Sequence, residues 1–251
     1  MKNSRAAIED RQQSILKELR QDERVSVQEL AARLGASPLT IRRDLDSLEK
    51  QGLLSRHYGG ATLLGDQPPK DFLQACREAI ARTAARYVAD RDTIFINSSS
   101  SALMLLNYVT AKGVTVITNN GKVLQFDLPA DMTVVLTGGE LRYPKGSMTG
   151  DFAVNNLGRV TAVKAFLGCS GLTAEEGFTT ASMQEVAINQ AMLARVTGSK
   201  FILADHTRIG KRHSFISGAP EQISCVITDA EADPQVLEEL KAKNIRIVQA
   251  T

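Results

Sequence analysis

The stretch SPLTIRRDLDSLEKQG, residues 37–52, decides how the start of this chain folds. Ser37 is a favoured helix N-cap, and Pro38 stands at the first helical position, where proline is well tolerated. Three apolar residues recur at a spacing that places them on one face of a helix: Ile41, Leu45 and Leu48. Gly52 is suited to the helix end. The stretch therefore predicts a helix of about four turns with one buried face.

The sequence on either side predicts a winged helix-turn-helix. Upstream, Ser26 and Glu29 match the S-x-x-E capping box, and Gly35 ends the helix that they begin. A second helix upstream is predicted over residues 7–20. Downstream, two short strands around Gly59–Gly60 fit a wing. We therefore expect a small DNA-binding domain over residues 1–64.

The face of the helix opposite the apolar residues carries the candidate DNA contacts. The early turns of the second helix of such a motif reach base edges, and arginine grips guanine with two hydrogen bonds. The expected DNA-binding residues are Ser37, Thr40, Arg42, Arg43, Ser47, Arg56 and His57. An arginine pair is also a common solvated surface feature, and residues 1–64 hold 11 Lys or Arg against 9 Asp or Glu. The combined motif, rather than charge, favours DNA binding.

The composition limits the other possibilities. The chain has 251 residues and a net charge of +2, so any basic surface must be local. We find no apolar run of membrane-spanning length and no signal peptide at the polar start of the chain. The cysteines Cys76, Cys169 and Cys225 form no CxxC pair and are expected to be reduced and buried. These features favour a cytoplasmic protein, and no motif points to a cofactor.

Residues 65–71, GDQPPKD, form a proline-bearing linker, and the remainder, residues 72–251, changes character. Apolar strand-like runs lie at 93–98, 114–119, 133–139, 164–170, 200–206, 225–230 and 245–250. Helical patterns lie between or beside them, at 71–90, 101–112, 121–127, 181–197 and 234–243. This alternation predicts a Rossmann-like α/β domain with a mainly parallel sheet, which binds ligands beyond the carboxyl ends of its strands.

Polar and small residues at these strand ends form the candidate effector site. The expected residues are Asn97, Ser98, Ser99, Ser100, Ser101, Asn119, Gly138, Gly139, Ser170, Asp205, His206 and Arg208. The four serines offer hydroxyls and amides to an anion, although plain helix capping also explains them. Arg208 provides a planar, bidentate grip on phosphate or carboxylate.

Other polar residues near these strand ends are weaker candidates. His206 either binds the ligand or lies in a surface loop. Arg142, Lys145 and Lys200 could face the site, although a solvated side chain is the default for each. His206 and His213 are seven residues apart without a third histidine or a cysteine cluster nearby in the sequence, so we expect no metal site.

The run VSVQELAARLGASPLTIRRDLDSLEKQGLLSRHYGGA, with VITNN, LTGG, FLGCSGL, GFTT and ITDA further on, resembles the DeoR family of bacterial transcriptional regulators. The resemblance implies a winged helix-turn-helix followed by a domain similar to ribose-phosphate isomerase that senses phosphorylated sugars or related metabolites. It also implies a homo-oligomer, a dimer or a tetramer, and repression of carbohydrate operons. Against the family pattern, Asn97 replaces an aspartate, Ser99 a glycine, and His206 and Thr207 two serines.

Two alternatives remain open. One is a sugar-phosphate isomerase fused to a DNA-binding module. It would need a catalytic base, but residues 168–172 provide no carboxylate where the resembled isomerases have an acidic segment, and Glu185 follows too loosely to be assigned. The other is an architectural DNA binder with a degenerate pocket. We expect a regulator without enzymatic activity, with operator DNA and a small anionic metabolite as partners.

Overall fold

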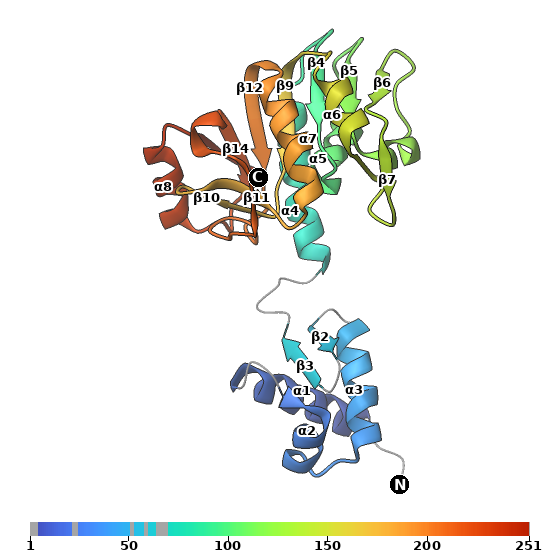
Figure 1. The fold of residues 1–251 in the computed structure, drawn as a ribbon. Coiled ribbons are helices and arrows are strands. Elements are labelled where there is room, and N and C mark those ends of the chain that lie inside the picture. The colour runs from blue at the N-terminus through green and yellow to red at the C-terminus, as the bar shows by residue number, and fades with distance from the viewer. Residues whose placement is uncertain (1–4, 22–24, 51–52, 58–59, 64–69, 251) are drawn as a thin grey trace. The chain divides into compact units, whose positions relative to one another are not determined.

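The computed structural model describes residues 5–21, 25–50, 53–57, 60–63 and 70–250 (Figure 1). The chain divides into two compact units, Met1–Leu73 and Gln74–Thr251. The predicted linker lies outside the described residues except for Lys70 and Asp71, which already belong to a helix.

The first unit is a helix-turn-helix with a small antiparallel sheet, as predicted. Its elements are α1 (Arg5–Gln21), β1 (Val25–Ser26), α2 (Val27–Arg33), α3 (Pro38–Lys50), β2 (Leu54–His57) and β3 (Gly60–Leu63), with the strands in the order β1-β3-β2. The capping box is formed: Ser26 Oγ accepts from the Glu29 amide at 3.2 Å, and Glu29 Oε2 accepts from the Ser26 amide at 2.7 Å. Gly35, at φ 60°, makes the turn between α2 and α3, a conformation that glycine adopts without strain.

The three apolar residues of the opening stretch lie in the core of this unit. Ile41, Leu45 and Leu48 are fully buried together with Ile15 of α1 and Leu30 of α2. The spacing read from the sequence therefore gave the correct inward face. The proposed stop at Gly52 and the first wing glycine, Gly59, lie outside the described residues.

One polar residue of α3 is also buried. Asp44 accepts hydrogen bonds from Arg11 Nε at 2.6 Å and from Arg11 Nη2 at 3.3 Å. The bond to Asp44 raises the pKa of Arg11. This two-pronged ion pair ties α1 to α3, and the sequence pattern alone did not indicate it.

The second unit is built on a seven-stranded parallel sheet. Its strands are β4 (Thr93–Ile96), β5 (Thr115–Thr118), β6 (Thr133–Leu136), β9 (Ala162–Gly168), β12 (Val196–Leu203), β14 (Cys225–Asp229) and β15 (Arg246–Ala250). They lie in the order β15-β14-β12-β9-β4-β5-β6, and all neighbours pair in parallel. Each corresponds to one of the seven predicted strands, so the predicted fold class is confirmed.

Helices cover both faces of this sheet (Figure 1). They are α4 (Lys70–Ala85), α5 (Ser100–Leu103), α6 (Asp151–Leu157), α7 (Met183–Ala194), α8 (Pro234–Ala242) and the 3-10 turns η1 (Met104–Tyr108), η2 (Gly121–Gln125) and η3 (Pro220–Gln222). Strand β4 shows the division: Phe95 packs into the core formed with α6, α7 and α8, whereas Ile94 and Ile96 pack into the core formed with α4, α5 and η1. Alternate side chains of a strand point to opposite faces, and here both faces are buried.

The predictions were wrong in two kinds of detail. The helix expected at 101–112 is one α-turn followed by η1, and at β-branched Val109 the backbone is already extended. Short strands were also missed: β7 (Glu140–Arg142), β8 (Ser147–Thr149), β10 (Gly171–Thr173), β11 (Gly177–Thr180) and β13 (Phe215–Gly218). Three of these segments contain a glycine, and none of the five lies in a long apolar run. Among the described residues, no helix is both long and apolar enough to cross a membrane.

Candidate functional site

Helix α3 presents the candidate DNA contacts of the first unit. Ser37 Oγ accepts from the Thr40 amide at 3.1 Å and lies 2.9 Å from Thr40 Oγ1, so this hydroxyl caps the helix. Arg42 and Arg43 are exposed, while Thr40 and Ser47 are half-buried. Arg56 and His57 belong to strand β2, and their side chains lie outside the part of the chain that the structure describes.

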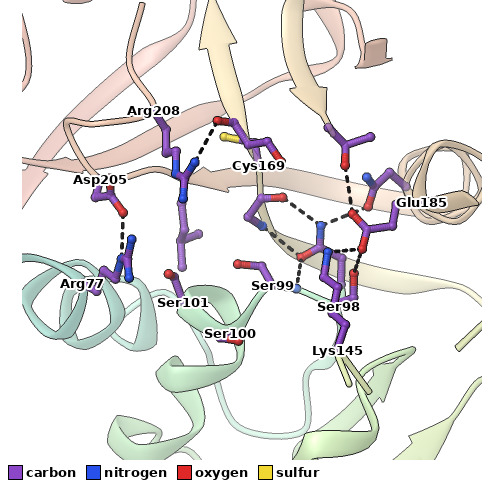
Figure 2. A pocket seen from close by; sticks show the side chains of 16 residues that line it. Arg77, Ser98, Ser99, Ser100, Ser101, Lys145, Cys169, Glu185, Asp205 and Arg208 are labelled. Carbon is purple, nitrogen blue, oxygen red and sulfur yellow. Dashed lines mark hydrogen bonds and ion pairs between the residues drawn. The ribbon is translucent and has the colours of Figure 1, made fainter. Parts of the chain in front are cut away.

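The second unit contains a cavity of about 260 Å³ at the carboxyl ends of β4, β9 and β12 (Figure 2). This is where open parallel sheets bind ligands. The lining residues are Arg77, Asn97, Ser98, Ser99, Ser100, Ser101, Lys145, Gly168, Cys169, Ser170, Thr180, Glu185, Asn189, Leu203, Asp205 and Arg208. Eight of the predicted effector residues are among them: Asn97, the four serines, Ser170, Asp205 and Arg208.

Asn97 fixes the floor of this cavity. Its Nδ2 donates to the Gly168 carbonyl at 2.9 Å and to Asn189 Oδ1 at 3.0 Å. Its Oδ1 accepts from the amides of Gly168 at 3.0 Å and Ser99 at 3.2 Å. The side chain thus cross-links the ends of β4 and β9, and its hydrogen-bonding groups are all engaged within the protein.

The serines pack tightly against the same strand. Ser99 Oγ accepts from the Ala102 amide at 3.3 Å and caps α5. A Cβ atom on Gly168 would lie 2.0 Å from Ser99 Oγ, so glycine is required there for steric reasons. Ser100 and Ser101 line the cavity (Figure 2). Plain capping therefore accounts for Ser99 but not for all four serines.

One end of the cavity is formed by two arginines and an aspartate. Arg77 Nε donates to Asp205 Oδ2 at 2.8 Å, and Asp205 Oδ1 also accepts from the Thr207 amide and hydroxyl. Arg208 Nη1 makes a long hydrogen bond of 3.4 Å to the Ser170 carbonyl. Both guanidinium groups lie on the same side of the cavity (Figure 2).

The other end centres on Glu185, whose side chain is buried. Its Oε1 accepts from Ser98 Oγ at 2.9 Å and from Lys145 Nζ, and its Oε2 accepts from Thr180 Oγ1 at 2.9 Å. Glu185, Arg77 and Asn189 were not predicted, and Lys145 was expected to be solvated. They come from α7, α4 and the β7–β8 loop, and no sequence spacing connects these segments with the strand ends.

Cys169 lies between the two ends. Burial raises the pKa of its thiol to about 12, although the nearby charge of Arg208 acts in the opposite direction. The group is therefore a neutral thiol at physiological pH, and it contributes polarisable surface rather than a nucleophile.

The remaining predicted effector residues are not brought into the cavity. Asn119 is fully buried and donates to the Met148 carbonyl at 3.0 Å, which holds β8 against the end of β5. Gly138 and Gly139, after the edge strand β6, have φ of 69° and 99° and shape a turn. His206 turns toward β14, where its Nδ1 lies 2.8 Å from Asp229 Oδ1. We expect all twelve residues at one site, but the cavity lining does not include the residues that follow β5 and β6, or His206 after β12.

The imidazole of His206 belongs to a cluster of three side chains that are far apart in the sequence. Potential metal ligands of Cys76, His206 and Asp229 lie within 4.8 Å of one another. Asp229 already accepts hydrogen bonds from the amides of His206 and Glu231 as well as the contact with the imidazole. These contacts hold the Asp229 carboxylate beside His206, and Cys76 lies near both, which the spacing of the histidines does not indicate.

A helix-turn-helix joined to an α/β unit with a polar cavity at its strand ends defines a class of protein, the two-domain transcriptional regulators. Residues 11–67 match the family model of the DeoR-like helix-turn-helix domain, and residues 74–230 match that of the DeoR C terminal sensor domain. The chain therefore belongs to the DeoR family and is a DNA-binding transcriptional regulator.

The chain is also similar to individual transcriptional regulators. The chain is 33% identical to the lactose phosphotransferase system repressor of Lactococcus lactis subsp. lactis, over 91% of this chain and 94% of the relative. It is 29% identical to the transcriptional regulator UlaR of Shigella sonnei, over 95% and 98%. Among solved structures, the sorbitol operon regulator SorC of Klebsiella pneumoniae is similar at 13% identity with a TM-score of 0.42, over 91% of this chain and 98% of that one.

Proposed function

We propose that this protein is a repressor of a carbohydrate-utilisation operon, controlled by a small phosphorylated sugar or a similar anionic metabolite. Residues 1–64 would bind the operator, and residues 72–251 would bind the metabolite. The matched relative from Lactococcus lactis, a repressor of a sugar phosphotransferase system, supports the operon class.

The observation that carries the proposal is the charge arrangement of the cavity. Three cationic side chains, Arg77, Lys145 and Arg208, line it against two carboxylates, Glu185 and Asp205. Arg208 has only one long hydrogen bond recorded within the described residues, so most of its donors remain for a ligand. A guanidinium fork suits phosphate oxygens, and the hydroxyls of Ser100 and Ser101 add neutral donors.

The two ends of the cavity suggest the orientation of the ligand. The phosphate would lie near Arg77 and Arg208, and sugar hydroxyls would lie toward Glu185, Ser98 and Lys145. A carboxylate accepts hydrogen bonds from sugar hydroxyls, and a site built to bind hydroxyls rejects analogues that lack them.

The operator would be bound by α3. Arg43 would contact base edges, Arg42 and Ser37 the flanking phosphates, with Thr40 and Ser47 beside them and Arg56 and His57 on the wing. Helix-turn-helix proteins of this kind bind two half-sites of an operator, so we propose that the protein is a homo-oligomer, a dimer or a tetramer. We also propose that it acts in the cytoplasm.

A two-part binding experiment tests the proposal. Thermal unfolding of the full chain would be followed with matched pairs of phosphorylated and unphosphorylated sugars. A ligand at 100 times its Kd stabilises by about 2.7 kcal/mol, and only phosphorylated members should do so. The same sugars would then be added to gel-shift titrations with DNA from upstream of the coding gene. Stabilisation by the unphosphorylated sugars alone would contradict the anionic effector, and a lack of operator response to a stabilising ligand would contradict its role as effector.

A second candidate, the isomerase-like enzyme, gains one observation from the structure. Residues 168–172 contain no carboxylate, but Glu185 and Asp205 line the cavity. Both accept hydrogen bonds from protein donors, Glu185 from three and Asp205 from Arg77 and Thr207, so a proton transfer from a sugar carbon would have to displace one of these contacts. Turnover of pentose or hexose phosphates by the purified protein, abolished by Glu185→Gln, would support the enzyme instead.

A further inference from the structure

Helix α4 runs from the boundary between the two units into the wall of the cavity. It begins at Lys70, and the division between the units falls after Leu73, within its first turn. Arg77, seven residues after the helix start, lines the cavity. At 1.5 Å per residue, about 10 Å of continuous helix separates the start of α4 from this side chain.

The two halves of α4 are held differently. In the second half, Ile80, Ala81 and Ala84 are buried in the core beneath the sheet. In the first half, Leu73 and Cys76 are buried outside both main apolar cores of the second unit, and the sulfur of Cys76 lies within 4.8 Å of side-chain atoms of His206 and Asp229. Among the described residues, the ion pair from Arg77 to Asp205 is the charged contact between the middle of α4 and the strand ends.

This ion pair is exposed to competition from a ligand. The Asp205 side chain is 4% exposed and keeps its place through Thr207, whereas the Arg77 side chain is 27% exposed. Among the described residues, Arg77 uses only its Nε, so both terminal nitrogens remain for other acceptors. An anion that enters beside Arg208 meets the like charge of Asp205 and the free donors of Arg77. It therefore competes with Asp205 for the guanidinium of Arg77, because the attraction of Arg77 to the anion opposes its attraction to Asp205.

We propose that the Arg77–Asp205 ion pair is the contact through which an anion in the cavity acts on the first half of α4, and hence on the DNA-binding unit. The inference rests on the proposed function, because it requires an anionic effector in this cavity. Without ligand, Asp205 holds the first half of α4 against the strand ends. With ligand, that hold is released, so the ligand has a different affinity for the two arrangements, as allosteric control requires.

The first experiment needs no ligand. Hydrogen exchange of the backbone amides of residues 70–77 would be compared in the full-length wild type, Arg77→Ala, Asp205→Asn and the control Arg86→Ala, which changes an exposed arginine just beyond the end of α4. Alanine has a higher helix propensity than arginine, so faster exchange in Arg77→Ala cannot come from a weaker intrinsic helix. We expect at least about tenfold faster exchange in Arg77→Ala and Asp205→Asn, the scale of losing a hydrogen bond to a charged group, and no change in Arg86→Ala. Unchanged exchange in Arg77→Ala would overturn the proposal.

The second experiment uses inorganic phosphate and ribose 5-phosphate as probes, with binding measured by calorimetry. In the wild type, a bound probe should accelerate exchange in residues 70–77. Arg77→Ala should show no further acceleration, whereas Arg208→Ala should bind more weakly but respond fully at saturation. Binding to the wild type without a change in residues 70–77 would overturn the switch while leaving the effector site intact. If neither probe binds, the anion site of the proposed function fails for these ligands, and the ligand-free comparison decides whether the contact anchors α4.

Discussion

Arg42 and Arg43 differ from the other arginines whose side chains are described in the first unit. Arg11 forms an ion pair with Asp44, and Arg33 forms one with Glu18, so both of these arginines have carboxylate partners within the unit. Arg42 and Arg43 are exposed on α3, and no ion pair of either is found among the described residues. Their charge is therefore available to DNA phosphates and bases.

The replacement Arg43→Ala should weaken binding to the specific operator by about 1–3 kcal/mol, or roughly 5- to 150-fold, because a bidentate contact to guanine is lost. Thermal stability should be unchanged, since the side chain is exposed. Gel-shift titration against operator and unrelated DNA measures the effect. Arg86→Ala, an exposed arginine of the second unit, is the matched control. Equal operator affinity of Arg43→Ala and wild type would remove Arg43 from the interface.

Cys169 should resist alkylation in the folded protein. With a pKa of about 12, its thiolate fraction at pH 8 is about one in ten thousand, and only the thiolate reacts. Labelling by iodoacetamide, followed by peptide mass spectrometry, should therefore be about a thousand times slower than for a free cysteine and should rise with pH up to 12. In urea, where the protein is unfolded, Cys169 should be labelled as fast as a free cysteine. Rapid labelling of the native protein would show that burial does not suppress the ionisation of this thiol.

The site residues that the sequence revealed and those it concealed differ in one respect. Ser98–Ser101, Ser170 and Arg208 follow strands directly, so topology alone brings them together. Arg77, in contrast, lies inside helix α4, and Glu185 lies inside helix α7. Their positions depend on how the helices pack over the sheet, which a pattern of apolar residues does not specify.

At the scale of the elements, the presence of an apolar run decided what could be predicted. The seven strands of the parallel sheet were identified because each lies within such a run, although the edge strands β6 and β15 are only partly buried. The outer strands β7, β8, β10, β11 and β13 are three or four residues long and were missed, yet the loop between β7 and β8 and strand β11 bring Lys145 and Thr180 into the cavity.

Helix caps give an element-scale test within the second unit. Asp233 caps α8, and its Oδ1 accepts from the Gln235 amide at 2.9 Å. Ser182 stands at the same position of α7 without such a bond. Asp233→Ala should lower the free energy of unfolding by about 0.5–2 kcal/mol, and Ser182→Ala by less than about 0.5 kcal/mol. Urea denaturation followed by circular dichroism compares them, and equal losses would contradict the assignment of the cap.

At the scale of the whole molecule, each apolar core found among the described residues is made of residues of one unit. The core of the first unit uses residues 15–61, and the two cores of the second unit begin at Ile80. A fragment of residues 70–251 should therefore unfold cooperatively and retain effector binding, while operator binding should be lost. Calorimetry with and without a sugar phosphate measures both. A fragment without a cooperative transition would show that the second unit depends on the first.

The complete hydrogen bonding of Asn97 has a consequence for engineering. Its amide joins Gly168, Asn189 and Ser99 and leaves nothing for a ligand. The base of the cavity is thus a fixed scaffold, while Ser100, Ser101 and Cys169 are available for variation. A library that randomises those three positions and keeps Asn97 should yield biosensors for new inducers without loss of the fold.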